Sequence, residues 1–179
     1  MTDTLSPFSR TAQHRQKRQA ILSEAANLFN AQGALATTLA DISSRLKLTK
    51  TSLYYYVKTK EELIYYCYLA TCHFHREILD TGNCANSTGR DKLEATIREY
   101  FRRFQNVMLN KEAQHAIMIE IPALKPEHRR EIQSLYFDLY KNYRSLVEEG
   151  MKDGSLKFCS PGPTTLALFG NLQWTVMWL

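Results

Sequence analysis

Glycine, proline and long apolar runs are scarce in this sequence. Its 179 residues include only seven Gly and five Pro, and this scarcity favours helices joined by short connections. No run of about 18 apolar residues occurs, so we predict no membrane-spanning segment. The first twenty residues lack the apolar core of a signal peptide, and a cytoplasmic protein is therefore expected.

Closely paired cysteines and the common catalytic motifs are also absent from the sequence. The four cysteines show no Cys-x-x-Cys spacing. We interpret them as reduced core thiols, and a redox-sensing role for Cys67 or Cys72 is the alternative. Neither the phosphate-loop motif G-x-x-x-x-G-K-[ST] nor the nucleophile motif G-x-S-x-G occurs. We therefore expect that the protein is not an enzyme, and an enzyme built on a helical bundle remains the alternative.

The spacing of histidines does not favour a metal or another cofactor. His73 and His75 diverge by about 200° on a helix, so they cannot share one ligand. Glu112 and His115 have the spacing used in di-iron bundles, but a second pair in that order is missing. We predict neither a metal site nor a cofactor.

Positive charge is concentrated in the first third of the chain. Residues 1–60 hold nine Lys/Arg and three Asp/Glu, a net charge of +6, whereas residues 61–179 carry a net charge of −1. This asymmetry is typical of a polyanion-binding module joined to a neutral body. A solvated basic surface without a nucleic-acid partner is the alternative.

Apolar residues recur at helical spacing along nearly the whole chain, with no internal repeat and no convincing strand. Turn residues such as Gly33, Pro122 and Pro126 separate the helical segments. Helices are expected over residues 13–32, 39–46, 50–57, 60–80, 91–110, 111–121, 126–153 and 164–179. The fold class is therefore all-α, with a small helical module over residues 1–60 and a larger helical domain over residues 61–179.

Two of these predicted helices are short and are separated by a tight turn at Lys47 and Leu48. Thr38, followed three residues later by Asp41, resembles a capping box at the start of the first helix. Thr49 is a suitable N-cap for the second. Two short helices joined by a tight turn are typical of a helix-turn-helix, whose second helix enters the DNA major groove.

Three consecutive tyrosines lie on the second short helix. Tyr54, Tyr55 and Tyr56 fan across about 200° of its circumference, so one face cannot bury all three. If Leu53 and Val57 mark the buried side, Tyr55 points away from it. Hydroxyls beside lysines on a helix flank are groups that fix a protein on the phosphate backbone. The alternative is that the three tyrosines are partly core and partly interface.

The sequence of residues 21–63 resembles the DNA-binding domain of the TetR family of bacterial regulators. The resemblance lies in AA-x-LF, then G-x-x-x-TT-x-x-DI, then T-x-x-SLYYY-V, and finally K-EEL. It implies a three-helix module followed by a helical effector-binding and dimerisation domain. It also implies a two-fold homodimer that binds a palindromic operator and is released when a small effector binds.

The resemblance also implies which side chains contact DNA. Base contacts are assigned to Lys50, Thr51, Ser52 and Tyr54, which follow the cap Thr49. Phosphate contacts are assigned to Thr38, Tyr55, Tyr56 and Lys60. The basic residues 14–18, HRQKR, are expected to add backbone or minor-groove contacts. The chain departs from the family at Lys47, where glycine is usual, and at Tyr56-Val57, where His-Phe is common.

The C-terminal part resembles a subset of these regulators that respond to fatty acids, sterols or acyl-CoA. The resemblance lies in P-EHRREI, at the start of the long helix, and in Asn171, Trp174 and Trp178. The residues expected to bind an acyl-CoA-like effector are Arg98, Phe101, Arg102, Tyr143, Asn171 and Trp174. The alternative is that these aromatic residues form core and that the arginines lie on solvated helix faces.

Dimerisation in the family uses the last two long helices, and here the final apolar helix reaches Leu179 with no further helix after it. We therefore expect an abbreviated interface or a truncated sequence. A DNA-binding architectural protein or an activator is a further alternative function. The large aromatic-rich body argues against an architectural protein, because DNA binding alone does not require such a body.

Overall fold

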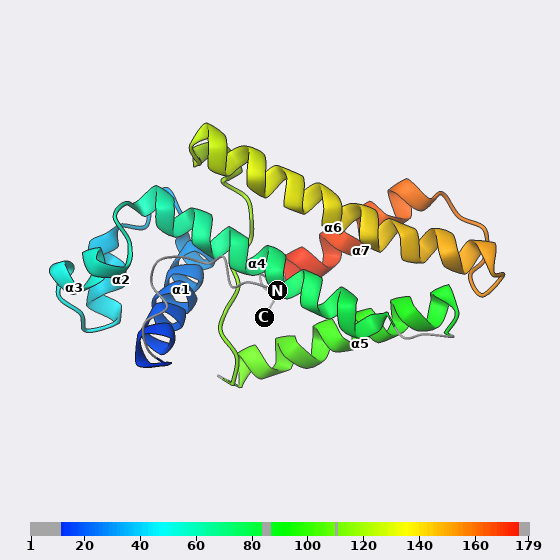
Figure 1. Cartoon of the computed structure of the whole chain (residues 1–179), viewed down its shortest axis with the longest axis horizontal. Helices are drawn as coiled ribbons and strands as arrows, with labels where there is room; N and C mark the ends of the chain where they lie inside the picture. Colours follow the sequence, from blue (N-terminus) through cyan, green and yellow to red (C-terminus); the bar gives the residue numbers. More distant parts are fainter. Residues whose placement is uncertain (1–11, 84–86, 110, 176–179) are drawn as a thin grey trace. The chain divides into compact units, whose positions relative to one another are not determined.

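The computed structural model describes residues 12–83, 87–109 and 111–175, and within these ranges all regular structure is helical (Figure 1). The α-helices are α1 (Ala12–Gln32), α2 (Leu39–Arg45), α3 (Lys50–Tyr56), α4 (Lys60–Gly82), α5 (Gly89–Met108), α6 (Pro126–Lys152) and α7 (Pro161–Trp174). The predicted all-α class is confirmed. Cys84 and Trp178, which the sequence analysis singled out, lie outside the described residues.

The described residues divide into two compact units. The first unit holds the residues up to Tyr68 together with Ala113–Lys125, and the second holds Leu69–Glu112 and the residues from Pro126 onward. Helix α4 passes from the first unit into the second. After α5 the chain returns to the first unit for thirteen residues before α6 begins in the second.

In the first unit, α2 packs on both α1 and α3. Gly33, at φ 86°, ends α1, and Thr38 caps α2 in a complete capping box with Asp41. The core of these helices is aliphatic and aromatic, and its members include Ile21, Ala25, Ala26, Phe29, Ile42, Leu53 and Val57. The short helices α2 and α3 therefore have fixed positions even though each is only seven residues long.

The turn between α2 and α3 contains Lys47, the one described residue other than glycine with a positive φ, at 53°. A side chain in this conformation costs about 1 kcal/mol that glycine would not incur. Lys47→Gly is expected to raise the free energy of unfolding by up to about 1 kcal/mol, measured by chemical denaturation. Gly33→Ala, at φ 86°, is the control of opposite sign, and a Lys47→Gly protein less stable than wild type would contradict the argument.

The prediction of a helix over residues 111–121 is wrong. Residues 113–120 form an extended segment, followed by a 3₁₀ turn at Ile121–Ala123. The backbone of this segment hydrogen bonds with side chains of the first unit, among them Ser23 and Asn30. Those partners replace the bonds that a helix would form within itself. We call residues 113–125 the connector.

In the second unit, α6 packs on both α5 and α7. Thr88 caps α5 in a second complete capping box with Asp91. The buried side chains of these helices include Tyr100, Phe104, Ile132, Leu139, Tyr143, Val147, Phe169 and Leu172. None of the helices in the described ranges combines the length and apolar character that crossing a bilayer requires.

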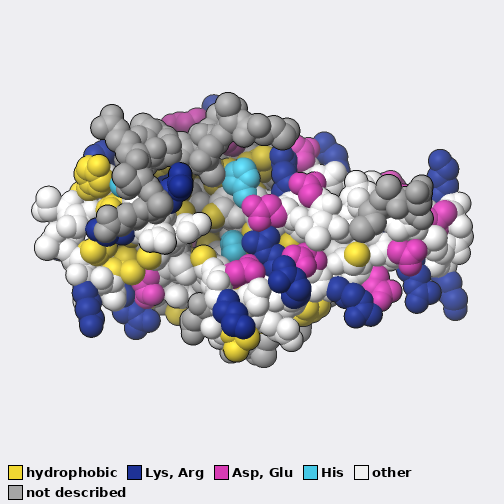
Figure 2. Space-filling view, turned by 60° about the horizontal axis from the view of Figure 1, so that its bottom comes forward, with side chains coloured by type: hydrophobic (Ala, Val, Ile, Leu, Met, Phe, Trp, Pro, Cys, Tyr) yellow, Lys and Arg dark blue, Asp and Glu magenta, His cyan; other side chains and the backbone are white. Residues whose placement is uncertain are grey.

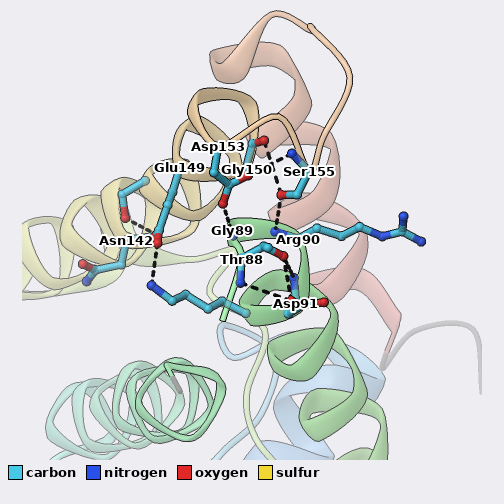
Figure 3. A network of polar contacts seen from close by, with 11 residues as sticks. Thr88, Gly89, Arg90, Asp91, Asn142, Glu149, Gly150, Asp153 and Ser155 are labelled. Carbon is cyan, nitrogen blue, oxygen red and sulfur yellow. Dashed lines mark hydrogen bonds and ion pairs between the residues drawn. The ribbon is translucent and has the colours of Figure 1, made fainter. Parts of the chain in front are cut away.

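The beginning of α5 and the end of α6 lie against each other (Figure 3). The Gly89 amide donates to Asp153 Oδ2 at 2.7 Å, and the Arg90 amide donates to Ser155 Oγ at 3.1 Å. These bonds satisfy backbone donors that the first turn of a helix leaves without intrahelical partners. The backbones approach so closely that a Cβ atom on Gly89 would overlap the backbone of Gly150.

Candidate nucleic-acid interface

Helix α3 is positioned by its buried side and its N-cap. Leu53 is 1 % exposed, and the Thr49 hydroxyl accepts a hydrogen bond from the Ser52 amide at 3.1 Å. The Ser52 hydroxyl lies 2.9 Å from that of Thr49. With this side fixed, the first residues of α3, Lys50 and Thr51, are exposed.

Four residues that the sequence assigned to DNA contact surround one hollow of the first unit. The hollow has a volume of about 320 Å³ and is lined by Thr38, Leu39, Ala40, Lys50, Leu53, Tyr54 and Lys60. Thr38 comes from the cap of α2, Lys50 and Tyr54 from α3, and Lys60 from the first residue of α4. Two lysines, a phenol and a helix N-terminus form a surface suited to an anionic backbone.

The three consecutive tyrosines have different environments. Tyr54 and Tyr55 are 47 % and 61 % exposed, whereas Tyr56 is only 9 % exposed. The Tyr56 ring packs against His14 of α1, with their centroids 4.7 Å apart. The expectation of an exposed phenol at Tyr56 is therefore not met, because the first turns of α1 cover a second side of α3. The alternative that the tyrosines are partly core describes Tyr56.

Thr38 is engaged in its cap. Its hydroxyl lies 2.7 Å from Asp41 Oδ2, and its amide donates to the same oxygen at 2.8 Å. The side-chain and backbone hydrogen bonds from Thr38 lower the pKa of Asp41 below its ordinary value. Asp41 is therefore charged at neutral pH, and a phosphate approaching Thr38 would compete with this carboxylate.

The basic stretch at residues 14–18 is part of α1 and not a separate arm. Within it, the Arg18 guanidinium lies over the Tyr66 ring, 4.7 Å from its centroid. Arg15 and Lys17 are exposed. The structure therefore separates Arg18, which packs on α4, from the two exposed basic residues of this stretch.

The six residues expected to bind an effector do not form one cluster. Tyr143 is completely buried, whereas Phe101 and Trp174 are 45 % and 46 % exposed. Arg98 pairs with Glu94 and Arg102 pairs with Glu99 on α5, at 2.7 Å and 2.6 Å. Asn171 is exposed and donates to Ala167 O within α7.

The two arginine pairs match the alternative of a solvated helix face. Each arginine is paired with a glutamate three or four residues away on the same helix, and exposed pairs of this kind contribute little to stability. On the face shown in Figure 2, Lys and Arg side chains lie among Asp and Glu side chains. The set chosen from the sequence thus combines one core residue with surface residues.

A buried polar cluster lies in the second unit, and the sequence analysis did not identify it. His75 Nδ1 lies 3.2 Å from the Tyr143 hydroxyl, and His75 Nε2 lies 3.2 Å from Gln173 Nε2. His75 and Gln173 are 2 % and 8 % exposed. The rings around His75 belong to Phe74, Tyr100, Tyr143 and Phe169. The helical repeat could have indicated His75, because it lies on the same face of α4 as Cys72 and Leu79.

The ionisable groups of this core are neutral at ordinary pH. Burial raises the pKa of Tyr100 to about 12 and raises the pKa of Tyr143 further. Burial also raises the pKa of Cys72 to about 12 and raises the pKa of Cys67. Thiols with a raised pKa are poor nucleophiles, which favours the core-filling interpretation of these cysteines over the redox-sensing one.

Two family models match this chain. The model described as "Bacterial regulatory proteins, tetR family" matches residues 21–67, and "Tetracyclin repressor-like, C-terminal domain" matches residues 86–179. The second match alone covers more than half of the chain. No curated protein sequence matches.

Solved structures of similar fold include a regulatory protein of the tetR family from Rhodococcus RHA1. It is 23 % identical, with a TM-score of 0.72, over 91 % of this chain and 85 % of that one. AibR, solved with isovaleryl coenzyme A and operator DNA, is 20 % identical with a TM-score of 0.72, over 91 % and 87 % of the two chains. A fatty acid metabolism regulator of Clostridium perfringens is 20 % identical with a TM-score of 0.63, over 89 % and 84 %. These likenesses show the fold.

Proposed function

Since the chain belongs to the TetR family of DNA-binding bacterial regulators, we propose that it is a cytoplasmic transcriptional repressor released from its operator by a small-molecule effector. The observation that carries the DNA-binding part is the meeting of Thr38, Lys50, Tyr54 and Lys60 around one hollow of the first unit. A sensing function gives the larger second unit, with its buried polar cluster, a purpose beyond DNA binding.

Base contacts in this proposal come from the start of α3. The ammonium of Lys50 donates to guanine O6 and N7, and the hydroxyls of Thr51 and Ser52 bind base-edge acceptors. Tyr54 packs on a thymine methyl group. Thr49 supports these contacts by capping the helix.

Phosphate contacts come from the surrounding flank. Tyr55 is exposed and offers a hydroxyl, Lys60 offers an ammonium group, and Thr38 lies at the N-terminus of α2, where backbone amides favour an anion. Tyr56 supports this surface from beneath, because its buried ring packs α3 onto α1.

A homodimer would place two such modules on a palindromic operator. The second unit offers apolar side chains for the contact between copies. Phe137 of α6 and Leu166 and Trp174 of α7 are 57 %, 62 % and 46 % exposed. Large exposed side chains of this kind are typical of interaction surfaces when they gather in one patch.

The effector in this proposal is a small apolar molecule with a polar group, such as a fatty acid or an acyl-CoA. His75, Tyr143 and Gln173 can exchange their mutual hydrogen bonds for bonds to a carbonyl oxygen, and the surrounding aromatic rings suit an acyl chain. Of the six residues expected from the sequence, Tyr143 is retained in this role. AibR, whose fold is similar, was solved with an acyl-CoA and operator DNA.

The test uses operator duplexes selected by the wild-type protein from a random-sequence pool and compared with the DNA upstream of its own gene. Fluorescence anisotropy of the complex is followed while palmitoyl-CoA is titrated, with free coenzyme A and palmitate as controls. Release by palmitoyl-CoA alone supports the acyl-CoA effector. A complex that ignores all three contradicts that effector, and failure to select any duplex contradicts the repressor itself.

A further inference from the structure

The connector is folded as part of the first unit, although it joins two helices of the second. Its backbone makes hydrogen bonds at several points along its length. The amides of Gln114 and Ile117 donate to Ser23 Oγ and Asn30 Oδ1, and the Glu120 amide donates to the Tyr68 hydroxyl. The Lys125 amide donates to Glu61 Oε1 at 3.0 Å. An extended segment thus lies on α1 and α4 without helical or strand partners of its own.

Asn30 is specific for an extended backbone. Its Nδ2 donates to the carbonyl of His115 and its Oδ1 accepts from the amide of Ile117, each at 2.9 Å. A side-chain amide can complete this pair only when the two backbone groups are two residues apart in an extended chain. Asn30 therefore fixes the register of the connector on α1.

Glu120 passes this register on to the loop before α2. Its carboxylate accepts the Leu35 amide at 2.9 Å, while Lys60 Nζ donates to the Leu35 carbonyl at 2.8 Å. One residue of the loop is thus gripped on its amide by the connector and on its carbonyl by α4. Three residues later the chain reaches Thr38, the cap of α2 and one wall of the hollow described above.

This grip is not required to bury anything. Leu35 is 64 % exposed, so water can satisfy its amide and carbonyl if Glu120 or Lys60 is removed. A bond that contributes little to the core and fixes a loop beside a ligand surface acts by positioning. Its loss should therefore change binding more than stability.

We infer that Glu120 and Asn30 are positioning residues for operator binding, which hold the α1–α2 loop and the cap of α2 in the arrangement that contacts DNA. The inference rests on the proposed function. It adds the connector, which lies far along the sequence from the helix-turn-helix, to the parts of the chain on which DNA affinity depends.

The first test compares Glu120→Ala with Glu120→Gln on the duplex selected by the wild-type protein. Gln keeps an oxygen that accepts the Leu35 amide but removes the negative charge, whereas Ala removes both. Glu120→Ala is expected to weaken binding about 5- to 10-fold and Glu120→Gln less than about 2-fold. Glu127→Ala, which removes an exposed charge from the first turn of α6, is the matched control and should bind like wild type.

The outcomes separate positioning from charge. Tighter binding by both Glu120 variants would show that Glu120 only repels DNA, and would overturn the inference. Equal binding by wild type and Glu120→Ala, or equal weakening by both variants, would overturn it as well. If the wild-type protein selects no duplex, the proposed function fails first, and the two failures are thereby distinguished.

A second test needs no variant. Because coupling between two sites is reciprocal, DNA bound to the first unit must stabilise the connector if the connector favours DNA binding. Hydrogen exchange at the amides of Leu35, Gln114, Ile117 and Glu120 is expected to slow at least about 3-fold on adding the duplex. The Gly89 amide, bonded to Asp153 in the second unit, serves as the control. Unchanged exchange in the connector would overturn the inference even if the Glu120 variants fold poorly.

Discussion

Lys50→Ala is expected to weaken binding to the selected operator by about 10- to 100-fold, the loss that follows when one good bidentate base contact is removed. Lys50 is the first residue of α3, is exposed and lines the hollow beside Tyr54. Its ammonium can therefore reach a guanine edge without a change in the buried side of the helix. Specificity should relax at one position of each half-site, because only the base contacted by Lys50 loses its donor.

Fluorescence anisotropy on the selected duplex and on variants with single base changes measures both effects. Tyr55→Phe is the comparison, because it removes one exposed hydroxyl proposed to contact phosphate and should weaken all sequences by a similar, smaller factor. Lys157→Ala, an exposed lysine of the second unit, controls for lost positive charge. Uniform weakening by Lys50→Ala across all duplexes would assign Lys50 to the phosphate backbone.

Gly89→Ala is expected to lower the free energy of unfolding by about 1–3 kcal/mol, the range for forcing an atom into a closely packed site. The added Cβ would overlap the backbone nitrogen of Gly150, and a backbone cannot rotate away as a flexible side chain can. The beginning of α5 would have to separate from the end of α6. The bonds from Gly89 to Asp153 and from Arg90 to Ser155 would then lengthen (Figure 3).

Urea denaturation followed by circular dichroism measures this loss. Gly170→Ala is the matched control, because a Cβ there meets nothing within 4 Å and α7 is helical on both sides. It should leave the stability unchanged or raise it by up to about 1 kcal/mol. A Gly89→Ala protein as stable as wild type would mean that the two helix ends separate without loss.

Features set by neighbouring residues could be predicted from the sequence. The capping boxes at Thr38 and Thr88, and the cap at Thr49, depend on side chains within three residues and were expected before the structure. The hollow shared by Lys50, Tyr54 and Lys60 also follows from local order, since short helices and tight turns keep these residues close together.

Features set by distant residues could not be predicted in this way. The connector is extended because Asn30 and Ser23, more than eighty residues earlier, satisfy its backbone. Tyr56 is buried because His14 reaches it from another helix. The helical pattern of α4 contained His75, but only the approach of Tyr143 and Gln173 makes it part of a cluster.

The discontinuity of the first unit has a consequence for engineering hybrid regulators. A chimera that joins the N-terminal residues of this protein to the sensing domain of another would leave the connector behind, because the chain returns to the first unit only at Ala113–Lys125. Its replacement would have to present an extended backbone to Asn30 and an acceptor to Leu35. Transplanting the connector together with the helix-turn-helix is therefore the rational crossover design.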